Sequence, residues 1–62
     1  KQYNISPREQ EVLVLIIKGK TNKEIAGELF ISLPTVKSHV SKIYEKLRVR
    51  NRLELSNLVK HS

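Results

Sequence analysis

Two lysines and two serines near the middle of the chain have the types and the spacing to bind a polyanion. They are Lys37, Ser38, Ser41 and Lys42, in the stretch TVKSHVSKIYEKL of residues 35–47. A lysine ammonium donates hydrogen bonds to phosphate oxygens and to base-edge acceptors such as guanine O6 and N7. A serine hydroxyl donates and accepts hydrogen bonds, and its small size lets a backbone approach another surface closely. The chemistry that these residues offer is therefore binding.

The apolar residues of the same stretch recur with the period of a helix, which predicts where the polar residues point. At 100° per residue they form one narrow stripe, made of Val36, Val40, Ile43 and Leu47. Nearly opposite this stripe lie Ser38, Ser41 and Glu45, with Lys37 and Lys42 on the shoulders. A merely solvated helix back is usually filled with long charged side chains. The small hydroxyls at its centre therefore favour a face that contacts another surface.

The positive charge of the chain is concentrated around this face. The 62 residues include twelve Lys and Arg against six Glu, which gives a formal net charge of +6. Residues 37–52 hold six of these basic residues and one acid, so a quarter of the chain carries +5. A localised basic footprint predicts a polyanionic partner, either nucleic acid or an anionic membrane surface. A membrane-surface helix needs bulky apolar residues on its buried side, and the narrow, β-branched stripe disfavours that alternative.

Length and composition exclude several other classes of protein. A chain of 62 residues forms one domain at most, with a small core. It has no cysteine, and hence neither a disulfide nor a thiolate zinc site, which favours a reducing compartment. The longest apolar run, residues 12–17, is far shorter than the roughly 20 residues that span a membrane, and nothing resembles a signal peptide. We therefore expect a cytoplasmic protein, and the start at Lys1 without Met predicts that it is part of a longer one.

Catalysis is not expected from this sequence. It contains no glycine-rich phosphate loop and no His/Asp/Ser constellation, and a domain of this size leaves no room for a deep cleft. His39 and His61 are the only histidines, and no carboxylates are arranged around either of them. We predict no enzyme activity, no cofactor and no metal site.

Capping signals predict four helices and no strand. A Ser or Thr followed three residues later by Glu forms a capping box, and this pattern occurs at Ser6 and at Thr21. Ser32 and Asn51 are the expected N-caps of two further helices, and Gly19 suits a left-handed helix end. The predicted helices span about 7–18, 22–29, 33–47 and 52–60. The predicted fold class is all-α, a four-helix bundle formed by a single domain of residues 1–62.

The second and third predicted helices, joined by a three-residue turn, form a helix-turn-helix. Ala26 lies where two crossing helices need a small side chain. The core between the two helices is predicted to contain Ile25, Leu29, Ile31, Val36 and Val40. Any small helical bundle with a tight corner remains an alternative, as does a protein-interaction module. The charge on the third helix favours a DNA-binding unit over both.

Several motifs resemble the LuxR/GerE family of bacterial DNA-binding domains, the output module of many response regulators and quorum-sensing regulators. They are SPRE, GKTNKEIA, LFIS, TVKSHVSKIYEKL and VRNR, and the resemblance covers residues 5–55. It implies a four-helix fold in which the third helix enters the major groove of double-stranded DNA. The chain departs from the family pattern at Arg48, where the family usually has Gly, and also at Val14, Leu55 and Ser56. The fourth region of bacterial sigma factors, which shares the KEIA and TVKS patterns, is the alternative family.

The resemblance also implies which residues bind DNA. The positions that match Lys37, Ser38 and Ser41 typically meet base edges, and the start of the second helix commonly faces the DNA backbone. Thr35 either contacts a phosphate or only supports the start of its helix, and His39 is expected at the packing boundary. Lys46, Arg50 and Arg52 are equally compatible with solvent and with DNA. The predicted DNA-binding residues are Lys20, Asn22, Lys23, Thr35, Lys37, Ser38, Ser41, Lys42 and Lys46.

Two protein partners are expected in addition to DNA. One recognition helix covers too few base pairs for genomic specificity, so we predict a homodimer on DNA through the fourth helix. Its interface candidates are Leu53 and Asn57, because Leu55, Leu58 and Val59 are expected to face the core. The second partner is an N-terminal regulatory domain of the same chain. Val14 and Ile17 are either scattered surface hydrophobes or a docking patch for that domain.

Overall fold

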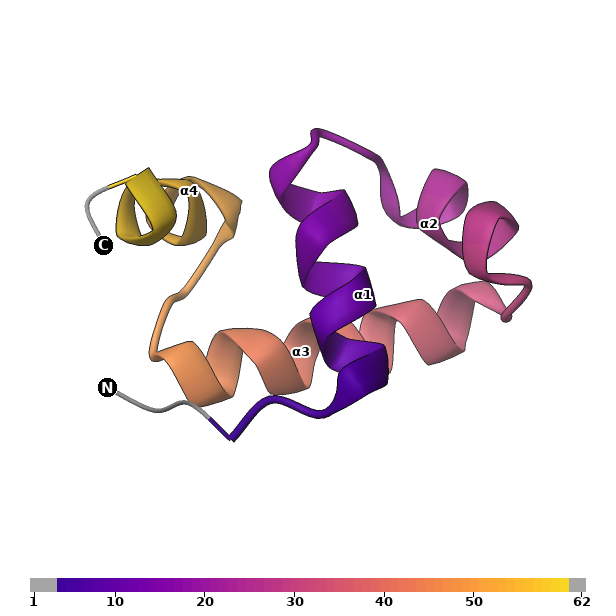
Figure 1. Cartoon of the computed structure of the whole chain (residues 1–62), viewed down its shortest axis with the longest axis horizontal. Coiled ribbons are helices and arrows are strands. Elements are labelled where there is room, and N and C mark those ends of the chain that lie inside the picture. The colour runs from indigo at the N-terminus through magenta and orange to yellow at the C-terminus, as the bar shows by residue number, and fades with distance from the viewer. Residues whose placement is uncertain (1–3, 61–62) are drawn as a thin grey trace.

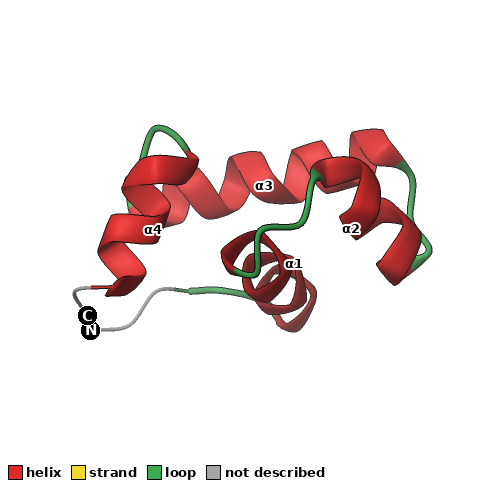
Figure 2. Cartoon of the chain, turned by 90° about the horizontal axis from the view of Figure 1, so that it is seen from above, coloured by secondary structure: helices red, strands yellow, loops and turns green. Residues whose placement is uncertain are grey.

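The computed structural model describes residues 4–60 of the chain, and within them the fold is all-α, as predicted. The four helices are α1 (Pro7–Ile17), α2 (Asn22–Leu29), α3 (Leu33–Leu47) and α4 (Arg52–Lys60). Helix α3 lies along the long axis of the molecule, and α1 crosses it (Figure 1). In the view from above, α2 and α4 lie at opposite ends of α3, and α1 lies between them (Figure 2). The helix-turn-helix of α2 and α3 thus rests on α1.

The predicted helix starts are confirmed at the level of individual hydrogen bonds. The Ser6 hydroxyl accepts from the Glu9 amide at 3.2 Å, and the Glu9 carboxylate accepts from the Ser6 amide at 3.1 Å. Thr21 and Glu24 form the same reciprocal pair at 3.1 and 2.9 Å. Each box satisfies two amides that have no partner within the helix. Sequence-local polar contacts therefore fix where α1 and α2 begin.

The ends of the helices depend on residues with positive φ. Helix α1 ends at Ile17, one residue before the predicted end, and Gly19 follows in a left-handed conformation with φ 92°. Phe30 after α2 and Arg48 after α3 adopt the same region, both with φ 58°. At Arg48 the backbone closes as a glycine would close it, and the Val49 amide donates to the Tyr44 carbonyl at 2.9 Å. A left-handed conformation is strained for a residue with a Cβ atom.

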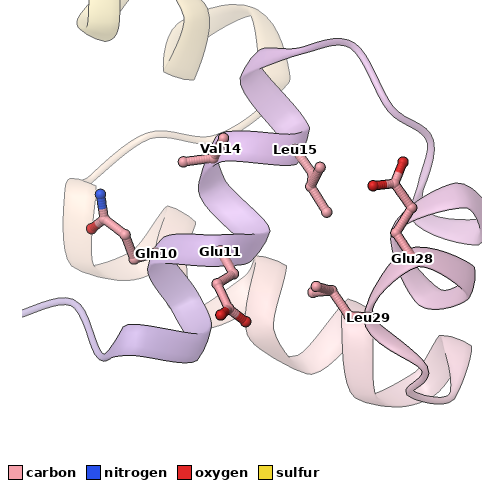
Figure 3. A pocket seen from close by; sticks show the side chains of 6 residues that line it. All are labelled: Gln10, Glu11, Val14, Leu15, Glu28 and Leu29. Carbon is pink, nitrogen blue, oxygen red and sulfur yellow. The ribbon is translucent and has the colours of Figure 1, made fainter.

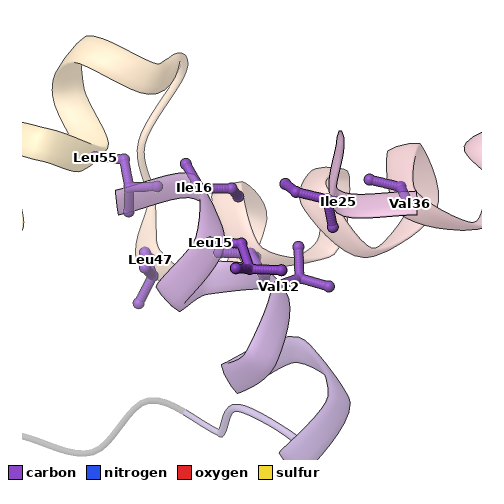
Figure 4. Close-up of a cluster of buried hydrophobic side chains, with 8 residues drawn as sticks. Val12, Leu15, Ile16, Ile25, Val36, Leu47 and Leu55 are labelled. Carbon is purple, nitrogen blue, oxygen red and sulfur yellow. The ribbon is translucent and has the colours of Figure 1, made fainter. Parts of the chain in front are cut away.

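The buried core joins all four helices. Ile25, Val36, Ile43 and Leu55 are fully buried, and Figure 4 shows side chains from α1, α2, α3 and α4 meeting in one cluster. Of the predicted core of the helix-turn-helix, Ile25 and Val36 are buried, whereas Leu29, Ile31 and Val40 are half-buried and pack against its edge. The buried hydrophobic residues are Val12, Leu15, Ile16, Ile25, Val36, Ile43, Leu47 and Leu55. Because this core holds α3 by its apolar stripe, the opposite side of α3 faces solvent.

Arg52, the first residue of α4, fastens that helix to the end of α1. Its Nη2 atom donates to the Ile16 carbonyl at 2.8 Å and to the Lys20 carbonyl at 2.7 Å. The Ile16 carbonyl also accepts from the Gly19 amide at 3.0 Å, so the guanidinium adds a second donor there and binds the Lys20 carbonyl just beyond the helix. We had expected Arg52 either in solvent or on DNA. The structure gives it a partner within the fold.

Candidate nucleic-acid interface

The outer side of α3 carries the predicted binding face. Lys37, Ser38, Ser41 and Lys42 are all exposed, whereas Val36 and Ile43 on the opposite side have no exposed surface. Within residues 4–60, no hydrogen bond or ion pair engages the side chain of either lysine. Two unpaired ammonium groups therefore flank two small hydroxyls on one open helical surface. This arrangement can accept an anionic partner without first breaking a contact of the fold.

Thr35 is involved in the start of α3. Its amide donates to the Ser32 hydroxyl at 3.3 Å, and the two hydroxyl oxygens lie 2.8 Å apart. If the Ser32 hydroxyl donates across this second contact, the Thr35 proton remains available for another acceptor. Both side chains are exposed. Thr35 can therefore support its helix and contact a phosphate at the same time.

Three further candidates lie at or near the start of α2, and they differ in exposure and in side-chain partners. Lys23 is exposed and has no side-chain partner in the described part of the chain, and Asn22 is half-buried as the first residue of the helix. Lys20 forms an ion pair with Glu28, with Nζ 3.3 Å from Oε2 and both side chains substantially exposed. Exposed pairs of this kind contribute roughly 0–1 kcal/mol. Lys20 could therefore exchange this partner for a phosphate at little cost.

Lys46 differs from the other predicted DNA-binding residues because its ammonium already has two partners. Its Nζ lies 2.7 Å from Oε1 of Glu9 and 2.8 Å from the carbonyl oxygen of Asn4. Glu9 is only 4% exposed. The hydrogen bond from Lys46, supported by the Ser6 amide, lowers the pKa of Glu9 to about 2, although burial acts in the opposite direction. The ion pair ties the end of α3 to the first turn of α1, and the bond to Asn4 ties it to the segment that precedes α1.

The remaining positive charge at the end of α3 belongs to Arg48 and Arg50. Both are exposed, and within residues 4–60 neither guanidinium takes part in a hydrogen bond or ion pair. The Arg50 backbone is used, because its amide donates to Glu54 Oε1 at 2.6 Å. Glu54 therefore contacts the residue before the N-cap Asn51, whose side chain accepts from the Glu54 amide at 2.9 Å.

Helix α4 presents the predicted dimer candidates to solvent. Leu53 is 70% exposed and Asn57 is also exposed, whereas Leu55 is fully buried. Val59, which we expected to face the core, is instead exposed, and that prediction was wrong. The side of α4 that packs against the core runs through Arg52, Leu55 and Leu58 at intervals of three residues. Val59 lies on the shoulder of this line.

A shallow apolar hollow lies between α1 and α2. Its volume is about 340 Å³, and Leu15 and Leu29 point toward each other across it (Figure 3). It is lined by Gln10, Glu11, Val14, Leu15, Glu28 and Leu29. Val14 remains 40% exposed and Ile17 45% exposed.

In the described residues no group of three metal-binding side chains exists, and no helix there could cross a membrane.

The fold and the face of α3 define a helix-turn-helix module. The model of the family "Bacterial regulatory proteins, luxR family" matches residues 3–59, and the chain therefore belongs to that family. The resemblance found in the motifs is thus confirmed, and the match favours this family over sigma factors.

Individual relatives agree with this assignment. The chain is 51% identical over 51 residues to the transcriptional regulatory protein LiaR of Bacillus subtilis. The aligned segment covers 82% of the chain and 24% of LiaR. It is 50% identical over 48 residues to the spore germination protein GerE of the same species, covering 77% of the chain and 65% of GerE. The response regulator protein VraR of Staphylococcus aureus is 48% identical over 50 residues, covering 81% of the chain and 24% of VraR. The chain thus spans about a quarter of the length of LiaR and VraR.

Proposed function

We propose that this chain is the DNA-binding domain of a bacterial transcriptional regulator, and that it binds a specific sequence in double-stranded DNA. The observation that carries the proposal is the open face of α3, where unpaired Lys37 and Lys42 flank Ser38 and Ser41 in a member of the luxR family. Duplex DNA is the polyanion that suits such a face, because its major groove is about 12 Å wide and admits an α-helix.

Different residues along α3 would contact the bases and the phosphates. The helix has 15 residues and is therefore about 22 Å long, which exceeds the width of the groove. Its first turns, with Lys37, Ser38 and Ser41, would enter the groove and contact base edges. Lys42, on the opposite shoulder, would meet the phosphates of the groove wall. Base contacts specify the sequence, and phosphate contacts position the protein.

The candidates outside the centre of α3 would bind the DNA backbone. Lys23, Asn22 and Thr35 lie near the starts of α2 and α3, where the positive end of each helix dipole favours a phosphate. Lys20 would add a contact once it leaves Glu28. Lys46 would have to leave both Glu9 and Asn4 to bind DNA directly. Its ion pair favours a different contribution, which is to hold α3 in position.

The whole regulator would contain more than this domain. The chain spans only about a quarter of LiaR and VraR, and we propose that it is joined to an N-terminal regulatory domain in a cytoplasmic protein. On DNA it would form a homodimer through α4, with Leu53 and Asn57 at the interface, because both are exposed. Their combined area is small, so the isolated domain should be monomeric or weakly dimeric in solution.

The proposal is tested by binding across a range of salt concentrations. If each subunit neutralises roughly four to six phosphates, log K should fall with log salt with a slope of about −4 to −5. Selection from random duplexes should return one half-site, repeated at a fixed spacing. Flotation with anionic vesicles is the matched comparison for the membrane alternative. A slope near zero on DNA, or no enrichment in the selection, would refute sequence-specific binding by this face.

A further inference from the structure

Arg48 ends α3 in a conformation that a glycine would adopt more easily. Its φ and ψ are 58° and 42°, in the left-handed region where a Cβ atom crowds the following carbonyl oxygen. The same chain places Gly19 in a positive-φ conformation after α1. Phe30 after α2 shares the left-handed conformation, with φ 58°, so what distinguishes Arg48 is its unpaired charge beside the binding face of α3.

The fold itself does not use the Arg48 side chain. The contacts that close α3 come from the backbone, where the Arg48 amide donates to the Glu45 carbonyl at 3.2 Å and the Val49 amide donates to Tyr44. A glycine would make both of these bonds. The Arg48 side chain is exposed, and its guanidinium has no hydrogen-bond or ion-pair partner in the part of the chain that the structure describes. Its charge is therefore available to a partner.

The position of Arg48 relative to the binding face indicates which partner. Arg48 follows Ser41 by seven residues, which is 20° less than two helical turns and about 10 Å along the axis. If Ser41 lies within a groove about 12 Å wide, a long side chain about 10 Å further along reaches its wall. The connection from α3 to α4 leaves α3 at this end, away from α2 (Figure 1). That connection also holds the exposed and unpaired Arg50.

We propose that Arg48 binds a DNA phosphate at the edge of the major groove, and that the strained end of α3 is retained for this contact. The inference rests on the proposed DNA binding and extends the interface beyond α3. An arginine suits the role because its guanidinium can donate two parallel hydrogen bonds to a phosphate. A glycine would relieve the strain and lose the contact. Stability and DNA affinity should therefore change in opposite directions at this one position.

The experiment compares Arg48→Gly, Arg48→Ala and Arg48→Lys with the unchanged domain, on the selected duplex and on a scrambled duplex across salt. Lys18→Ala is the matched control, since Lys18 is also exposed without a side-chain partner in residues 4–60 and carries the same charge. Arg48→Gly and Arg48→Ala should each lower the affinity for both duplexes by a similar factor. Each should also make the slope of log K against log salt shallower by about 0.9. Arg48→Lys should keep most of the slope, and Lys18→Ala should match the unchanged domain.

Thermal unfolding supplies the second readout. Arg48→Gly should raise Tm by about 4–8 °C, the shift expected for relief of one strained residue in a domain of this size. The phosphate contact would be overturned if Arg48→Gly bound DNA as tightly as the unchanged domain. It would also be overturned if Lys18→Ala lost as much DNA affinity as Arg48→Gly. An unchanged or lower Tm would overturn the claim that the arginine strains the helix end. An unchanged domain that binds neither duplex would refute the proposed function itself, and the inference with it.

Discussion

Replacing Arg52 by alanine should destabilise the domain, although Arg52 lies at its surface. The guanidinium makes two charged hydrogen bonds, to the carbonyls of Ile16 and Lys20 at 2.8 and 2.7 Å, in partly buried surroundings. A hydrogen bond to a charged group contributes about 1.5–3 kcal/mol. Because a single nitrogen serves both carbonyls, and water can partly replace it, we expect a loss of about 2–3 kcal/mol in the free energy of unfolding.

That loss is large for a chain of this length. At about 0.05–0.15 kcal/mol per residue, 62 residues give a total stability of roughly 3–9 kcal/mol. Urea unfolding followed by circular dichroism measures the difference, with Arg50→Ala as the control, because Arg50 is exposed and its side chain has no partner in residues 4–60. The control should stay within about 0.5 kcal/mol of the unchanged domain. Equal stability of Arg52→Ala and Arg50→Ala would refute the role of Arg52 as the clamp between α4 and α1.

Three further predictions concern pH, dimerisation and the hollow between α1 and α2. Because the pKa of Glu9 falls from 4.5 to about 2 on folding, its ion pair stabilises the fold fully above pH 4.5 and is lost as the pH falls toward 2. Unfolding measured across this range should be less pH-dependent in Glu9→Gln. Leu53→Lys should reduce the gain in affinity of a properly spaced pair of half-sites over one half-site, and an unchanged gain would exclude α4 as the interface. Val14→Lys in a full-length regulator should weaken contact between the domains, and an equal interdomain affinity would leave Val14 as an ordinary surface residue.

The parts of the fold that the sequence could predict are those determined by near neighbours along the chain. The Ser6 and Thr21 capping boxes involve residues three apart, and the buried stripe of α3 follows from helical periodicity alone. Together with the N-caps Ser32 and Asn51, these signals were sufficient to define the helix starts, the fold class and the outward direction of Ser38 and Ser41.

Contacts between distant residues could not be predicted from such patterns. Lys46 and Glu9 are 37 residues apart, and Arg52 and Ile16 are 36 apart, so their pairing depends on how the helices cross. From the sequence, Lys46 and Arg52 were indistinguishable from any other basic residues near α3. A buried glutamate at the start of α1 and two carbonyl oxygens at and just beyond its end are the features that attract them, and both become visible only with the fold. The contacts between these residues and DNA involve a second molecule, so the DNA-binding residues stay predictions.

The most direct test of the central claim compares Lys37→Ala with Lys42→Ala. Both lysines are exposed without side-chain partners in the described residues, and alanine favours a helix, so neither change should unfold the domain. Each variant is titrated against the selected duplex and a scrambled duplex across salt. Lys37→Ala should cost about 1–3 kcal/mol on the selected site and relax the preference at one base pair. Lys42→Ala should lower the affinity for both duplexes by the same factor and make the slope of log K against log salt shallower by about one unit. An equal fractional loss on both duplexes in Lys37→Ala would contradict the claim that this face of α3 recognises sequence.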